Sequence, residues 1–135
     1  MDFKNLLNRF FNNSKEKNIP PPVLKTFQSQ FKNSLNIDWS TNGESYEAIF
    51  YLNELEHIAR IKNDGLLESL KINLPLNKLP LAIHKQVDQL GEVMSAIAIY
   101  RENMINYELI VRDHQLNRYF LLLDENGKVI EKEKL

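Results

Sequence analysis

The side chains that could do chemistry are scattered along this 135-residue chain rather than gathered into a known pattern. The histidines, His57, His84 and His114, lack the spacing of three or four residues that places two metal ligands on one helix face. The chain has no cysteine, which excludes a thiolate zinc site, a disulfide and a cysteine nucleophile. It also has no glycine-rich phosphate loop and no Gly-x-Ser-x-Gly elbow. We therefore expect no enzyme activity, no metal and no cofactor.

Two other features resemble chemical sites only superficially. Glu47 and Glu108 occupy equivalent places in two similar segments and could form a carboxylate pair, but the sequence supplies no third partner for them. The segment Asp124-Glu125-Asn126-Gly127 lacks the later acidic positions and the closing Glu of an EF-hand calcium loop. We interpret the two glutamates as exposed strand residues and the segment as a hairpin turn.

Composition narrows the classes of partner. Lys plus Arg number 17 against 18 Asp plus Glu, so there is no basic field for nucleic acid or an anionic membrane. No apolar run approaches the roughly 18 residues of a membrane span, and residues 1–18 lack the apolar core of a secretory signal. We expect no nucleic-acid partner, no membrane contact and a cytoplasmic location as written, with a processed envelope form as the alternative.

One strand pattern organises the chain. Tyr46–Phe50 has a close copy in Tyr107–Val111, 61 positions later, and both alternate their side chains with the period of two that is typical of a strand. An offset of 60 to 62 also relates Pro20 to Pro80, Trp39 to Tyr100 and Gly65 to Gly127. The sequence therefore predicts a tandem repeat, with units at 19–76 and 77–135 after an N-terminal segment 1–18.

Each repeat is predicted to hold one proline-led helix and four strands. The first helix covers about 21–32 and its strands 36–40, 45–52, 54–62 and 66–73; the second begins at 79–80, with strands 93–101, 105–112, 116–123 and 128–132. Asn-Gly and Asp-Gly between strands favour tight antiparallel hairpins. We predict an α+β fold of two α-β-β-β-β repeats, with the helices on one face of an antiparallel sheet.

The N-terminal segment has the apolar stripe of an amphipathic helix. Its apolar residues fall at i, i+3, i+4, i+7 and i+8: Phe3, Leu6, Leu7, Phe10 and Phe11. Such a face must be buried against the rest of the chain, a second copy, a partner helix or a membrane surface. Lys4 and Arg9 are the only basic residues between Phe3 and Phe11. This weakens the membrane alternative, because helices that lie on a membrane surface usually carry many basic residues on their polar face.

Several of these segments together resemble a known family. In order they are Pro22–Phe27, Trp39, Tyr46–Phe50, Asn63–Gly65 and Leu79–Ile83, and they resemble the PepSY-like proteins related to the β-lactamase-inhibitor-like (BLIP-like) fold of Bacteroidetes-type bacteria. The resemblance runs from Pro20 to about Lys132. It implies a joint sheet with helices on one face and the other face open for binding, and it supplies no catalytic residues.

The open face is the predicted binding site. If Tyr46, Ala48 and Phe50 point inward, both apolar and charged residues lie on the opposite face, although a solvated face should be polar. A one-residue slip in phase would reverse the two faces. The outward residues are Glu47, Ile49, Tyr51, Ile58 and Arg60 in the first repeat and Glu108, Ile110, Arg112, Phe120 and Leu122 in the second.

Three alternatives remain for what covers this face: the N-terminal helix, a second copy in a homodimer, or a foreign partner. We predict a non-enzymatic binding or inhibitor-like module that engages a protein or peptide. The alternatives are a structural homo-oligomer and a small-molecule-binding protein.

Overall fold

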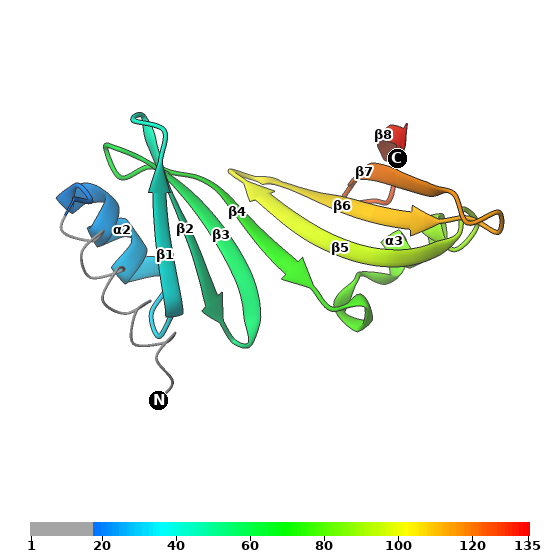
Figure 1. Cartoon of the computed structure of the whole chain (residues 1–135), viewed down its shortest axis with the longest axis horizontal. Coiled ribbons are helices and arrows are strands. Elements are labelled where there is room, and N and C mark those ends of the chain that lie inside the picture. Colours follow the sequence, from blue (N-terminus) through cyan, green and yellow to red (C-terminus); the bar gives the residue numbers. More distant parts are fainter. Residues whose placement is uncertain (1–17) are drawn as a thin grey trace. The chain divides into compact units, whose positions relative to one another are not determined.

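A computed structural model describes residues 18–135, which hold eight β-strands, two short α-helices and a 3-10 helix (Figure 1). The chain divides into two compact units, Met1–Leu70 and Lys71–Leu135. The predicted amphipathic helix at Phe3–Phe11 lies outside the described residues.

The first unit contains helix α2 (Pro21–Gln30) and strands β1 (Leu35–Thr41), β2 (Ser45–Leu52) and β3 (Leu55–Lys62), with β4 (Leu67–Leu74) continuing into the second unit. Strand β2 pairs antiparallel with β1 and with β3. Between β2 and β3, Asn53 and Glu54 both have positive φ, the conformation that a two-residue hairpin needs. Prolines 20 to 22 begin α2 because the first turn of a helix needs no internal partner for its N–H groups.

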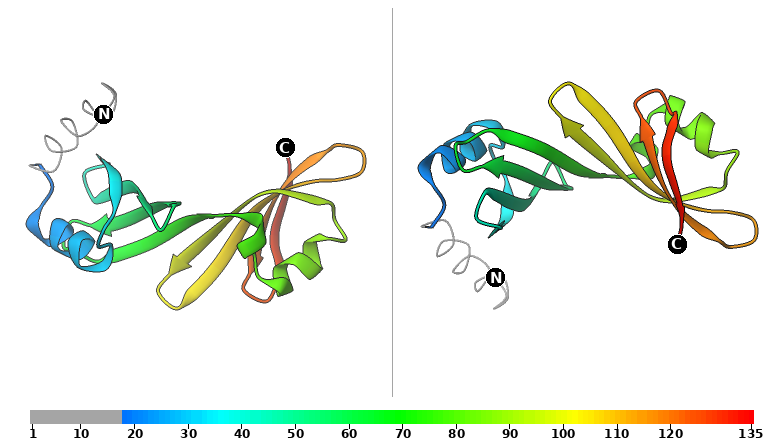
Figure 2. Two further views of the ribbon diagram at one scale, coloured as in Figure 1. Left: turned by 90° about the horizontal axis from the view of Figure 1, so that it is seen from below. Right: turned by 90° about the horizontal axis from the view of Figure 1, so that it is seen from above.

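Helix α2 lies against one face of the strands of the first unit (Figure 2), and an aromatic core holds it there. Phe27 of the helix meets Trp39 of β1 and Phe50 of β2 edge to face, with ring centroids 5.1 and 5.0 Å apart. Val23 and Phe31 extend the helix contact, and Ala48, Ala59 and Ile61 complete the buried sheet face. The helix therefore covers one face of these strands.

A glycine lets a loop approach α2 closely. Gly65 has φ +97°, and a Cβ there would lie 2.9 Å from the carbonyl oxygen of Pro22. The hydroxyl of Thr26 on the helix donates to the carbonyl oxygen of Gly65 at 2.6 Å. The backbone contact thus requires a residue without a side chain, and the hydroxyl ties the loop to the helix.

The second unit contains the 3-10 helix η1 (Leu76–Lys78), helix α3 (Leu81–Val87) and strands β5 (Glu92–Arg101), β6 (Met104–Arg112), β7 (Arg118–Asp124) and β8 (Val129–Lys134). The four strands form an antiparallel meander. Leu79, Ile83 and Val87 from the helical side share a core with the strands, whose buried members are Ala96, Ala98, Tyr107, Leu109, Val111, Leu121 and Leu123. Here too the helix covers one face of the strands.

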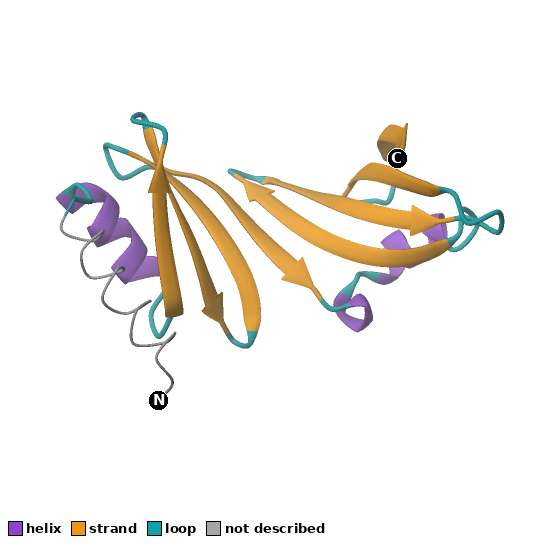
Figure 3. Cartoon of the chain, in the orientation of Figure 1, coloured by secondary structure: helices purple, strands orange, loops and turns teal. Residues whose placement is uncertain are grey.

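The predicted fold class is wrong. The described residues are mostly antiparallel β structure of eight strands with helices of only ten and seven residues, so an α+β fold of two tandem repeats with an N-terminal helix is not shown (Figure 3). Helix α3 is short because the N–H groups of Leu90 and Gly91 both donate to the carbonyl oxygen of Val87, which closes the helix. A Cβ on Gly91 would also lie 2.3 Å from the carbonyl oxygen of Arg112, so this backbone follows β6 rather than continuing a helix.

Candidate functional site

In each unit the sheet has one face packed on its helix and a second face, which we call the outer face. On β2, Ala48 and Phe50 are fully buried, whereas Glu47 and Ile49 are half-buried and Tyr51 is exposed. On β6, Tyr107, Leu109 and Val111 are buried, and the residues between them are half-buried. The burial confirms the predicted strand phase, while the binding role of these residues stays a prediction.

The predicted site residues are gathered in two sets, one in each unit. The outer face of the first unit carries Glu47, Ile49, Tyr51, Ile58 and Arg60, and that of the second unit carries Glu108, Ile110, Arg112, Phe120 and Leu122. The predicted residues of the N-terminal stripe lie outside the described residues.

Cross-strand pairs organise the outer face of the first unit. Ile49 lies opposite Ile58, and Glu47 lies opposite Arg60. The Arg60 guanidinium donates to the Glu47 carboxylate at 3.2 Å, with 49% and 33% of the two side chains exposed. At that exposure the ion pair contributes little stability. The glutamate that could have joined a carboxylate pair therefore has a cationic partner of its own.

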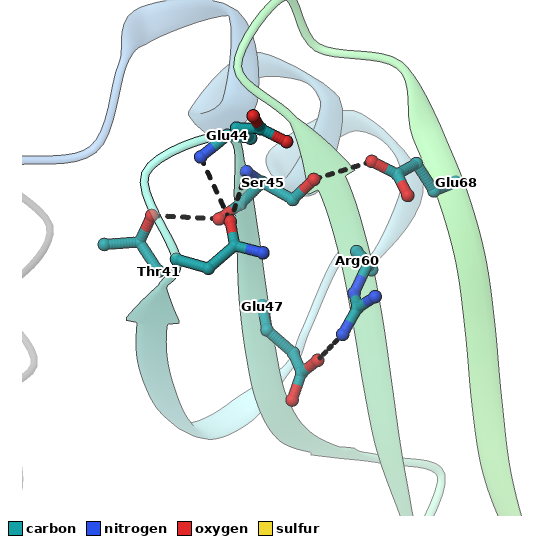
Figure 4. A network of polar contacts seen from close by, with 7 residues as sticks. Thr41, Glu44, Ser45, Glu47, Arg60 and Glu68 are labelled. Carbon is teal, nitrogen blue, oxygen red and sulfur yellow. Dashed lines mark hydrogen bonds and ion pairs between the residues drawn. The ribbon is translucent and has the colours of Figure 1, made fainter.

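A polar network continues this face at the start of β2 (Figure 4). The Asn42 Oδ1 atom accepts hydrogen bonds from the backbone N–H groups of Glu44 and Ser45. The Ser45 hydroxyl donates a hydrogen bond to the Glu68 carboxylate at 2.6 Å. A shallow hollow of about 210 Å³ lies here, lined by Ser40, Thr41, Asn42, Ser45, Glu47 and Arg60. Sequence reasoning identified Thr41–Gly43 as a turn but missed the bond to Glu68, because no local pattern joins β2 to β4.

The outer face of the second unit has an apolar centre. Phe120 lies opposite Ile110, and Leu122 lies opposite Glu108, whose other neighbour is Ile97 of β5. All five side chains are half-buried. Ile97 was missed by sequence reasoning, although its alternation with the buried Ala96 and Ala98 was the signal that could have identified it.

The end of this face is polar. The Arg112 guanidinium donates to the Glu92 carboxylate at 2.9 Å, and both residues line a hollow of about 500 Å³ together with Asp88, Gly91, Asp113, His114 and Leu116. Backbone N–H groups of Asn117 and Gln115 donate to the Asp113 carboxylate at 2.9 Å. The bond from Asn117 is the main reason that the pKa of Asp113 is lowered. This carboxylate thus organises a turn.

Two ionisable side chains of the sheet, Tyr107 and His57, are buried. Burial, with smaller contributions from Tyr100 and Glu125, raises the pKa of Tyr107. His57 stacks on Phe50 with its Nδ1 atom 2.8 Å from the Leu55 carbonyl oxygen.

Within residues 18–135, no three His, Cys, Asp or Glu side chains are placed to hold a metal ion. None of the helices in that range is long and apolar enough to cross a membrane.

Comparison with known proteins identifies the fold. The chain matches no model of a known protein family, and no curated protein matches it. Among solved structures, a BLIP-like protein of Bacteroides fragilis superposes with a TM-score of 0.72 at 15% identity, covering 86% of each chain. A DUF2874 family protein of Bacteroides uniformis gives 0.75 at 15% identity, covering 85% of this chain and 88% of the other. The chain therefore has a BLIP-like fold.

A third neighbour concerns location. This predicted periplasmic protein of Bacteroides eggerthii has a TM-score of 0.74 and 16% identity, covering 85% of this chain and 88% of its own. The finding contradicts the expected cytoplasmic location, which depended on the missing apolar core in residues 1–18 and on the absence of a long apolar run. At such identity the likeness concerns the fold alone, and these comparisons do not confirm the relation to PepSY-like proteins.

Proposed function

We propose that the chain is a non-enzymatic binding module that engages a protein or peptide through the outer face of the second unit. The observation that carries the proposal is the cross-strand pair of Phe120 and Ile110, with Leu122 beside it, on the face opposite the helix. A solvated antiparallel face alternates to polar residues, so this apolar centre favours a covering partner. Similarity to a BLIP-like protein supports an inhibitor-like role, and similarity to a periplasmic protein supports an envelope location.

The apolar centre alone gives modest affinity. Full burial of a Phe, Ile or Leu side chain contributes about 1.5–3 kcal/mol. Phe120, Ile110 and Leu122 are already half-buried, with no more than about a third of each residue still exposed, so covering them adds roughly 1–3 kcal/mol in total on that scale. A Kd of 1 mM corresponds to about 4 kcal/mol, and association also costs translational freedom. A partner must therefore gain further contacts from the polar surroundings of this face.

Affinity capture from a native lysate tests the proposal. Phe120→Asp places a charge at the apolar centre, whereas Lys85→Asp places one on the exposed surface of α3 in the same unit. We expect the wild type and Lys85→Asp to capture the same protein and Phe120→Asp to lose it, with all three giving the same circular dichroism spectrum. Equal capture by all three proteins would contradict the proposal.

A second copy of the chain could cover the same face, which makes a structural homo-oligomer the competing function. The same apolar centre favours it, because an isologous contact places equivalent patches against each other. Light scattering on the wild type and Phe120→Asp separates the two functions. A dimer that Phe120→Asp dissociates would favour the homo-oligomer, whereas a monomeric wild type favours the foreign partner.

A further inference from the structure

Strand β8 sorts its charges between the two faces of the sheet. Glu131 lies opposite Leu122 and Glu133 opposite Phe120, whereas Lys132 lies opposite the buried Leu121. Directly opposed residues share a face, so the glutamates of β8 border the outer face and its lysines border the helix side. The Lys132 ammonium lies 4.7 Å from the centre of the ring of Tyr119, which packs against the core on the helix side, and this supports the assignment. The alternating Glu-Lys sequence thus gives the outer face an acidic edge.

The glutamates lie directly beside the apolar centre. In one row across the strands, Leu122 has Glu131 on one side and Glu108 on the other, and in the next row Phe120 has Glu133 beside it. Neighbouring strands are about 4.8 Å apart, so each carboxylate lies within reach of whatever covers the adjacent apolar side chain.

Within the described part of the chain, none of these three carboxylates forms an ion pair, unlike Glu47 with Arg60 and Glu92 with Arg112. An uncharged partner would remove them from water without compensation, and an acidic partner would be repelled. An anionic membrane surface is repelled in the same way. A second copy would bring three more glutamates into the interface. A partner with Lys or Arg next to its apolar side chains could cover the apolar centre and neutralise the carboxylates beside it.

We infer that the outer face of the second unit binds a protein segment that combines apolar side chains with Lys or Arg. This inference rests on the proposed function and adds the chemistry of the partner. The apolar part of the segment covers Ile97, Ile110, Phe120 and Leu122, and its cations meet Glu108, Glu131 and Glu133. Specificity comes from the carboxylates, because apolar contact alone does not distinguish one apolar segment from another.

Two synthetic peptides of equal length test the inference. Both carry Leu at the same positions, and the remaining positions are all Lys in one peptide and all Glu in the other. Binding of each fluorescent peptide to the full chain is measured by anisotropy at low and at physiological salt. We expect the Lys peptide to bind, with an affinity that falls as salt rises, and the Glu peptide to bind at least about tenfold more weakly.

The matched variant exchanges the charges of β8 without changing net charge: Glu131→Lys, Lys132→Glu, Glu133→Lys and Lys134→Glu. It moves lysines to the outer face and glutamates to the helix side, so the preference should shift from the Lys peptide toward the Glu peptide. Glu108→Gln is the second variant, since it changes one side chain and leaves β8 intact, and it should weaken binding of the Lys peptide. The inference is overturned if the β8 variant keeps the preference for the Lys peptide and Glu108→Gln binds that peptide as tightly as the wild type does.

Phe120→Asp separates this inference from the proposed function. If both peptides bind the wild type equally and Phe120→Asp removes both, the face binds apolar segments without charge preference. That outcome overturns the inference and leaves the proposed function standing. If Phe120→Asp retains the Lys peptide at full affinity, the peptide binds elsewhere on the chain, and both proposals are overturned.

Discussion

Replacing Gly65 by alanine should destabilise the first unit much more than the same change at Gly43. The two glycines have almost the same φ, +97° for Gly65 and +96° for Gly43. A Cβ at Gly43 would meet nothing within 4 Å, whereas a Cβ at Gly65 would lie 2.9 Å from the Pro22 carbonyl oxygen and 3.2 Å from the Thr26 hydroxyl. The pair therefore separates backbone strain from steric contact.

The expected magnitudes follow from these two terms. An alanine at positive φ costs about 1–2 kcal/mol, and this cost applies to both variants. Overpacking against a backbone oxygen that cannot move away adds about 1–3 kcal/mol at Gly65 alone. We expect losses of about 1–2 kcal/mol for Gly43→Ala and about 2–5 kcal/mol for Gly65→Ala, because only the second change pushes α2 away from its loop.

Urea unfolding measured by tryptophan fluorescence is the assay. Trp39 is the single tryptophan of the chain and is only 3% exposed in the core of the first unit, so its emission reports the unfolding of that unit. Equal losses of unfolding free energy in the two variants would refute the reasoning, since they would show that the approach of Gly65 to the helix carries no steric constraint.

Two further predictions concern polar groups. Asp113→Ala should lower the melting temperature at neutral pH, because Asp113 accepts two backbone hydrogen bonds in its turn. The backbone N–H of Asn117 is the main cause that lowers the pKa of Asp113 in the folded chain, so the stabilisation is present above the ordinary carboxyl pKa and is lost as the pH falls through the lowered, folded pKa; a loss independent of pH would contradict this assignment. Trp39→Phe should cost far less than the 3–5 kcal/mol that is typical of Trp→Ala, about 1 kcal/mol or less by circular dichroism, because no residue within 18–135 accepts a hydrogen bond from the buried indole N–H. A loss as large as that of Trp39→Ala would refute it.

Local patterns predicted the strands, their phase and their antiparallel pairing with the next strand, but they did not predict the fold class. Alternation around Tyr46 and Tyr107 correctly separated buried from outer side chains, because a strand that covers a core on one side must follow a period of two. The fold class was wrong because proline-led apolar stripes indicate where a helix begins without fixing its length, and α3 ends at Val87 through contacts with the following turn.

The charged border of the second outer face could not be predicted from alternation alone. Strand β8 extends to Lys134, beyond its predicted end at 132, and its register shifts between Leu122 and Leu123. That irregularity leaves Ile130 without a paired partner and decides that Glu131, rather than Lys132, lies on the outer face. One residue more or less in the irregularity would reverse the charge of the border, and only the pairing of β7 with β8 fixes it.

Cross-strand pairing also explains why acidic residues on the two outer faces differ in availability. Glu47 lies opposite Arg60 and is paired with it, and Glu68 accepts a hydrogen bond from Ser45, so these carboxylates of the first unit are engaged within their own sheet. Glu108 lies between Leu122 and Ile97, neither of which can accept or donate a hydrogen bond through its side chain. Glu47 is thus compensated by a cation directly opposite it, whereas Glu108 has apolar side chains on both neighbouring strands. A mutation at Glu47 should therefore act mainly on the first unit's own ion pair, whereas a mutation at Glu108 should act mainly on binding.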